Sequence, residues 1–145
     1  MSRSNKFGEV IARRRLAIAG SPRRAVMVSI GQPRRIRGTS DWECPFRISG
    51  DGIRLFDYGY GVDAMQALIT ALGGIRFRLD SAGRSFTFLG SEYLGFDRSI
   101  PFWGDTAATR RLERLVDREV LRYVRELKRN HEVRSRQKAR RRTSG

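Results

Sequence analysis

The stretch DWECPFRISGDGIRLFDYGY, residues 41–60, carries the clearest fold signal in this sequence of 145 residues. From residue 42 to residue 48 every second side chain is apolar, the set being Trp42, Cys44, Phe46 and Ile48. This period of two predicts a half-buried strand at 41–49. Pro45 has no N–H group, so we expect this strand to lie at an edge or to carry a bulge. The Gly-Asp-Gly turn at 50–52 leads into another strand at 53–60.

Two further strands are predicted before this stretch, at 10–18 and 25–30, joined by a turn at Gly20-Ser21-Pro22. They form a hairpin with Pro22, Arg23 and Arg24 near its tip. Residues 31–40 read as a basic loop, and 85–90 as a short fifth strand or extended piece. We expect the aromatic segment at 95–104 to lie over the core.

Residues 61–83 have the pattern of a helix that begins at an N-cap, Asp63, with Gln66 three residues later. Large apolar residues recur at helical spacing: Met65, Leu68, Leu72, Ile75 and Leu79. A stripe of small residues runs beside them: Ala64, Ala67, Ala71 and Gly74. This stripe lets the helix approach a sheet closely. The predicted fold is α+β, an antiparallel meander of four to five strands packed against one helix, followed by a long basic C-terminal helix.

Composition limits the function. The chain has 30 Lys and Arg against 15 Asp and Glu, a net charge of +15, which favours an anionic partner. Its one cysteine, Cys44, allows no disulfide within the chain and favours a reducing compartment. We find no signal-peptide pattern at the N-terminus and no apolar run long enough to span a membrane. The sequence therefore predicts a cytoplasmic protein without membrane contact.

The chain after residue 105 has a different composition. Both Trp and all eight Phe precede residue 105, and no Gly or Pro occurs from Thr106 to Arg142. This run predicts a long helix capped by Asp105 or Thr106. One face is apolar: Leu112, Leu115, Val116, Val120, Tyr123, Val124 and Leu127. We expect packing up to about residue 128. The predicted domains are a small α+β domain at 8–104 and, at 105–145, a basic amphipathic helix with a disordered Arg-rich tail.

Arginines form the other face of this helix. Expected Arg–Asp/Glu pairs three or four residues apart neutralise part of it before Glu126, whereas 134–142 contains no carboxylate. We expect phosphate contacts without base stacking, because the tail has no aromatic residues. The candidate nucleic-acid-binding residues are Arg118, Arg122, Arg125, Arg129, Arg134, Arg136, Lys138, Arg140, Arg141 and Arg142. The basic residues at 13–15, 23–24 and 34–37 are candidates to share one surface. That surface could extend the positive electrostatic field of the helix.

Three motifs resemble a family of short bacterial domains of unknown function. They are Trp42-x-Cys44-Pro45-Phe46-Arg47-Ile48, then Gly61-x-Asp63-x-x-Gln66-Ala67-Leu68, then Leu89-Gly90 with Leu94-Gly95-Phe96. The family pattern continues with proline where this chain has Asp97. The resemblance covers roughly residues 8–104. It implies an α+β fold and no catalytic residues, and it says nothing of the extension from residue 106.

The residues that could act in catalysis or metal binding are explained more simply by structural roles. The strand pattern points Cys44 into the core, where a thiolate is disfavoured. His131 is the only histidine and has no evident zinc-ligand or triad partners. Asp57 and Asp63 are candidates for an acid–base pair, but a strand end and a helix cap explain them. We therefore expect no enzymatic activity, no cofactor and no metal site.

The preferred hypothesis is a non-enzymatic module that binds nucleic-acid phosphates non-specifically. The alternative is a protein-interaction module, of the inhibitor or immunity type, that binds an acidic protein or self-associates. Spacing leaves open whether the helix at 106–128 packs on its own domain or on another chain. DNA against RNA, the pathway and the oligomeric state are also open.

Overall fold

A computed structural model describes residues 7–98 and 104–143 and divides into two units, Met1–Ser99 and Ile100–Gly145. The division falls a few residues before the domain boundary expected at 104.

An antiparallel sheet forms the first unit. Its six strands are β1 (Val10–Ile18), β2 (Ser21–Gly31), β3 (Arg34–Arg35), β4 (Trp42–Gly50), β5 (Ile53–Gly61) and β6 (Phe86–Thr87). β4 pairs with β5 on one side and with β2 and β3 on the other, β1 pairs with β2, and β6 pairs with β1. β1, β2, β4 and β5 are the predicted meander. β3 lies in the predicted loop at 31–40, and β6 is shorter than expected.

Turn chemistry fixes the two hairpins. Asp51 and Gly52, with φ of 48° and 81°, join β4 to β5. A two-residue turn with both φ values positive favours Asp-Gly, because it matches the twist of the flanking strands. The first hairpin turns at Ala19 and Gly20, since β2 already begins at Ser21. Pro22 therefore lies within β2, next to its first residue, which is still near the hairpin tip.

Pro45 lies in the middle of the sheet, which corrects the expectation of an edge strand or a bulge. β4 is paired on both sides, but β2 pairs with residues 46–49 and β3 with Trp42 and Glu43. Pro45 falls in the gap between these two ladders and pairs only across β5, with Tyr58. A break between two partner strands accommodates the missing N–H as well as an edge would.

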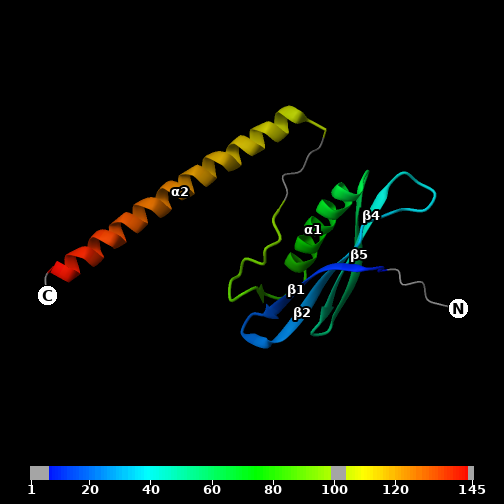
Figure 1. The fold of residues 1–145 in the computed structure, drawn as a ribbon, viewed down its shortest axis with the longest axis horizontal. Coiled ribbons are helices and arrows are strands. Elements are labelled where there is room, and N and C mark those ends of the chain that lie inside the picture. Colours follow the sequence, from blue (N-terminus) through cyan, green and yellow to red (C-terminus); the bar gives the residue numbers. More distant parts are fainter. Residues whose placement is uncertain (1–6, 99–103, 144–145) are drawn as a thin grey trace. The chain divides into compact units, whose positions relative to one another are not determined.

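The helix α1 (Ala64–Asp80) lies against the sheet (Figure 1). Its cap is as predicted: Asp63 accepts a hydrogen bond from the Gln66 backbone N–H at 2.7 Å, and Gln66 Oε1 accepts one from the Val62 N–H at 2.7 Å. Ala67, Ala71, Ile75 and Leu79 are the buried residues of α1. Met65, expected on the buried face, is 67% exposed. The contact with the sheet is therefore formed by the small residues Ala67 and Ala71 together with Ile75 and Leu79.

The core lies between α1 and the sheet. Its largest fully buried side chains include Phe46, Leu16, Ile48 and Ile75. Cys44, Phe46 and Ile48 are buried and Trp42 packs against the core, so the alternation in β4 has the predicted direction. Phe96 is also buried, as expected for the 95–104 segment. Residues 99–103 of that segment lie outside the described residues.

The second unit is the helix α2 (Thr106–Thr143). Asp105 caps it, accepting a hydrogen bond from the Ala108 N–H at 3.0 Å. The described residues of α2 are all at least partly exposed, and packing of its apolar face up to residue 128 stays a prediction. The tail expected to be disordered is helical as far as Thr143. Arg, Lys, Gln and Ala are strong helix formers and no Gly or Pro interrupts them, which accounts for this correction.

Candidate nucleic-acid interface

One face of α2 is a stripe of guanidinium groups. At about 100° per residue, eight arginines lie within about 40° of a common line along the helix. They are Arg111, Arg114, Arg118, Arg122, Arg125, Arg129, Arg136 and Arg140. We call this set the arginine stripe. Four candidate residues, Arg118, Arg122, Arg125 and Arg129, follow one another along it, so the structure brings them together.

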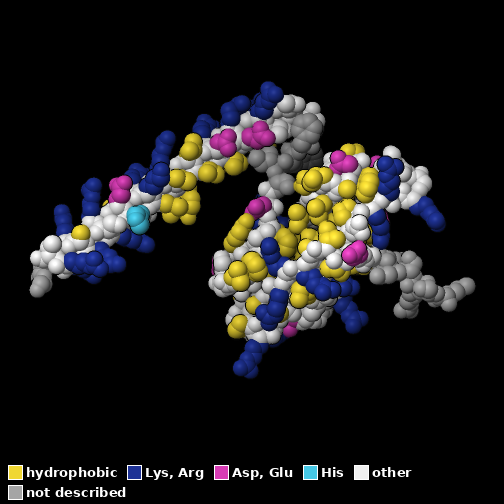
Figure 2. Space-filling view, viewed as in Figure 1, with side chains coloured by type: hydrophobic (Ala, Val, Ile, Leu, Met, Phe, Trp, Pro, Cys, Tyr) yellow, Lys and Arg dark blue, Asp and Glu magenta, His cyan; other side chains and the backbone are white. Residues whose placement is uncertain are grey.

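The opposite face of α2 changes character along the helix. Up to Leu127 it is apolar, with exposed fractions between 38% for Val124 and 60% for Tyr123. From residue 134 onward the same side carries four other candidate cations: Arg134, Lys138, Arg141 and Arg142. Figure 2 shows basic side chains on one edge of α2 in its N-terminal part and on both edges toward its C-terminus. The last turns of the helix are therefore cationic all round.

Carboxylates neutralise little of the arginine stripe. An ion pair joins Arg122 to Glu119 at 2.5 Å, three residues apart, in place of the expected pair with Glu126. Among the residues that the structure describes, Arg118, Arg125 and Arg129 have no ion-pair partner. The same holds for Arg134, Arg136, Lys138, Arg141 and Arg142. Exposed pairs of long side chains gain little free energy, which explains why most expected pairs do not form.

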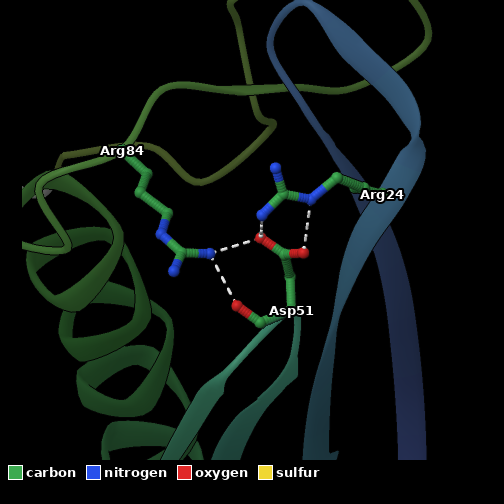
Figure 3. A network of polar contacts seen from close by, with 3 residues as sticks. All are labelled: Arg24, Asp51 and Arg84. Carbon is green, nitrogen blue, oxygen red and sulfur yellow. Dashed lines mark hydrogen bonds and ion pairs between the residues drawn. The ribbon is translucent and has the colours of Figure 1, made fainter.

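Basic residues of the sheet domain behave differently, because several hold the fold together. Asp51 accepts two hydrogen bonds from Arg24, to Oδ1 at 2.7 Å and to Oδ2 at 2.9 Å (Figure 3). Arg84 contacts the same carboxylate and donates to the Asp51 carbonyl oxygen at 2.6 Å. The hydrogen bonds from Arg24 and the positive charge of both arginines lower the pKa of Asp51. This cluster ties β2, the β4–β5 turn and the segment after α1 together.

The arginines at 13–15 do not share one surface. Arg14 points to the α1 side of the sheet, where it donates to the Leu94 and Gly95 carbonyl oxygens, both at 2.9 Å. Its guanidinium lies 4.5 Å from the ring centre of Phe88. Arg13 is opposite Ser29 in the neighbouring strand and lies on the other face, because side chains alternate along β1. Arg14 is therefore a structural residue and not a candidate contact.

Residues considered for catalysis have structural partners. Cys44 is fully buried, and burial raises its pKa to about 11. Asp57 accepts hydrogen bonds from Arg78 at 2.6 and 3.2 Å, and these lower the pKa of Asp57. Asp63 caps α1, and His131 is exposed on α2. Within residues 7–98 and 104–143 no three His, Cys, Asp or Glu side chains cluster as metal ligands would.

One group of exposed residues was missed by the sequence analysis. Phe56, Tyr58 and Tyr60 occupy alternate positions of β5 and lie on the face of the sheet opposite α1. Their period-two spacing is visible in the sequence, where it predicts a strand but does not by itself indicate an aromatic surface. Arg47 and Arg54 share this face. Their positions become meaningful once the strand register is known.

Comparison with protein families agrees with the motifs. A family model described as "Domain of unknown function (DUF6968)" matches residues 12–98, which is more than half of the chain. The chain belongs to this family. The DUF6968 domain comprises the sheet, α1 and all three motifs, and the resemblance to an uncharacterised domain family is confirmed. α2 lies outside the matched residues. No curated protein and no solved structure matches the chain.

Neither helix of the described chain combines the length and the apolar character that crossing a bilayer requires.

Proposed function

We propose that this DUF6968 chain is a non-enzymatic binding module that contacts nucleic-acid phosphates through α2. The observation that carries the proposal is the arginine stripe, together with the cations surrounding the last turns of the helix. Most of these groups have no carboxylate partner among the described residues. Guanidinium groups bind phosphate oxygens through paired hydrogen bonds.

The spacing of the stripe suits a phosphate backbone. Arg118, Arg122 and Arg125 are separated by four and three residues, or about 6 and 4.5 Å along the axis. Phosphates on one strand of a duplex advance by about 3.4 Å per nucleotide. Neighbouring arginines of the stripe are therefore one to two nucleotides apart. The proposal predicts contact with the backbone and little sequence preference, since phosphates carry no base information.

We also propose a reducing, cytoplasmic setting for this protein, because the sequence contains a single cysteine. Cys44 is buried and unpaired, and β4 provides no second thiol.

Truncation after Val133 tests the role of the basic end of α2. It removes six cations: Arg134, Arg136, Lys138, Arg140, Arg141 and Arg142. Affinity for a labelled duplex is measured by fluorescence anisotropy over a series of salt concentrations. If all six contact phosphates, the slope of log affinity against log salt falls in magnitude by up to about 5.

A charge-preserving variant is the matched control. Replacing Arg134, Arg136, Arg140, Arg141 and Arg142 with lysine keeps the net charge and most of the salt slope, because counterion release depends on charge. A truncated chain that binds duplex as tightly as the intact one at equal ionic strength would refute the proposal.

The exposed apolar face of α2 favours a second candidate, a protein-interaction function. Its large residues are between 38% and 60% exposed in the described chain, and unpartnered apolar helix faces are typical of sites that bind another helix. The occupant would be a second copy or an acidic protein. Sedimentation of the intact chain over a range of concentrations tests self-association, and replacing Val120 and Leu127 with Ser should abolish it.

A further inference from the structure

The face of the sheet opposite α1 combines aromatic rings with arginines. Residues directly opposite each other in antiparallel strands share a face. One row across the sheet is Arg13, Ser29, Arg47 and Phe56, and the next is Arg15, Met27, Ser49 and Arg54. The buried core residues Val28 and Ile48, one position along, point to the other side. We call this surface the open face.

Four rings follow one another along the open face. The ring centres are 5.8 Å apart for Phe7 and Phe56, 5.0 Å for Phe56 and Tyr58, and 6.0 Å for Tyr58 and Tyr60. Phe56 is 43% exposed and Tyr60 is 55% exposed. Phe7 is buried and Tyr58 is half-buried, so Phe56 and Tyr60 are the two rings of this series that are exposed enough to stack on a ligand.

A hollow beside Phe56 has a volume of about 410 Å³ and is lined by Phe7, Arg47, Ser49, Arg54, Leu55 and Phe56. The hollow is shallow and open to solvent, so a flat group could lie on it. The lining is mainly apolar, and two guanidinium groups provide charge. Arg47 lies 4.6 Å from the ring centre of Phe7, and Arg54 has no ion-pair partner in the described parts of the chain.

The open face has a clear excess of positive charge. Strand pairing places Arg13, Arg15, Arg34, Arg47 and Arg54 on it. Among its described residues Glu43 is the one carboxylate, and Arg34 already holds it at 2.8 Å. A ligand that matches this surface has negative charges at its edge and flat rings to stack on Phe56 and Tyr60.

We propose that the open face binds single-stranded nucleic acid, with bases stacked on Phe56 and Tyr60 and phosphates bound by Arg47 and Arg54. Bases in a duplex are stacked inside it, so protein rings can stack only on unpaired bases. An acidic polypeptide matches the arginines but offers no flat rings, and a second copy of this face would bring like charges together. This inference rests on the proposed function and extends it by specifying single-stranded nucleic acid as the ligand. The residues that would bind it lie in the sheet and not in α2.

Two leucine substitutions test the stacking. The variant carrying Phe56→Leu and Tyr60→Leu keeps apolar bulk and removes both flat rings. Affinity is measured by anisotropy for a labelled oligothymidylate of about 12 nucleotides and for a duplex of the same length. Single-strand affinity should fall about tenfold or more, while duplex affinity changes by less than about twofold.

Phe77→Leu is the matched control, because Phe77 is 65% exposed but lies on α1. It should bind both oligonucleotides as the parent does. Unchanged single-strand affinity in the double variant would overturn the inference, as would an equal loss for single strand and duplex. Poly-L-glutamate that competes as well as oligothymidylate at equal charge would assign the face to acidic polypeptides and would also overturn it.

Photocrosslinking supplies a readout that needs no variant. An oligonucleotide containing 5-iodouracil should attach to the tryptic peptide at 55–76, which holds Phe56, Tyr58 and Tyr60. Attachment confined to the α2 peptide with Tyr123 would overturn the inference. Truncation after Val133 separates the two proposals: unchanged duplex affinity there refutes the role of α2 and leaves the ring-dependent result intact.

Discussion

Replacing Gly59 with alanine tests the close approach of β5 to α1. Gly59 is in β5, and a Cβ built there would lie 2.1 Å from the Ala71 backbone nitrogen and 2.5 Å from the Ala67 carbonyl oxygen. Real Cβ atoms essentially never come within 3.0 Å of a neighbour. Both atoms belong to the backbone of α1, so no side-chain rotation can relieve the clash. The helix must move away from the sheet.

The expected loss of unfolding free energy follows from the packing that is lost when α1 moves away from the sheet. Forcing one extra carbon into a packed core costs about 1–3 kcal/mol and sometimes more. Because the obstacle at Gly59 is backbone, and because lifting α1 also loosens Ala67, Ala71 and Ile75, we expect at least about 3 kcal/mol. At about 1–2 kcal/mol per M of urea, the midpoint of unfolding falls by about 1.5–3 M.

Gly73→Ala is the matched control, since it makes the same chemical change with the opposite expected sign. Nothing lies within 4 Å of a Cβ built at Gly73, which is inside α1. Alanine there should stabilise the domain by about 0.5–1 kcal/mol, because glycine is a poor helix former. Urea unfolding followed by Trp42 fluorescence, with Trp103 replaced by Phe in every variant, measures both changes. Midpoints that shift in the same direction by similar amounts would refute the reasoning.

Three further predictions concern single side chains of the sheet domain. Hydrogen bonds from Arg24 lower the pKa of Asp51 in the folded state. The ionised carboxylate therefore stabilises the fold above the unfolded pKa near 4, and this stabilisation is lost as the pH falls below that value. Between about pH 5 and pH 2, the Asp51→Asn variant should lose less free energy of unfolding than the parent in urea titrations. With a pKa of about 11, the Cys44 thiol should react with a disulfide reagent at pH 8 at least about 100-fold more slowly in the folded protein than in urea, and equal rates would contradict its burial. Arg14→Ala removes two charged hydrogen bonds to backbone carbonyls and should cost about 2–4 kcal/mol, whereas Arg13→Ala should change unfolding by no more than about 0.5 kcal/mol.

Local patterns predicted the elements well. The alternation from Trp42 to Ile48 gave the strand and the direction of its buried face, and Asp63 with Gln66 marked the start of α1. The sequence predicts the small-residue stripe, but helical spacing also groups Met65 with the large apolar residues, and Met65 is exposed. In the structure close approach dominates, since Gly59 and Gly61 of β5 leave room for backbone and not for long side chains.

Contacts between distant residues could not be predicted in this way. Asp51 lies 27 residues from Arg24 and 33 from Arg84, and no periodic pattern connects them. Pro45 fits an interior strand because β2 and β3 leave a gap along the same side of β4, which depends on register. The aromatic surface of the open face could not be predicted for the same reason. Strand spacing places Arg54 and the rings on one side of β5, but the pairing of Phe56 with Arg47 of β4 depends on the assembled sheet.

The absence of buried residues in the described part of α2 has a thermal consequence. Backbone hydrogen bonds hold α2 together, so its helix–coil transition should be broad, whereas a packed sheet domain melts cooperatively. Circular dichroism at 222 nm and Trp42 emission should then give two different melting curves on heating. Added polyphosphate should shift the dichroism curve upward and leave the fluorescence curve nearly in place.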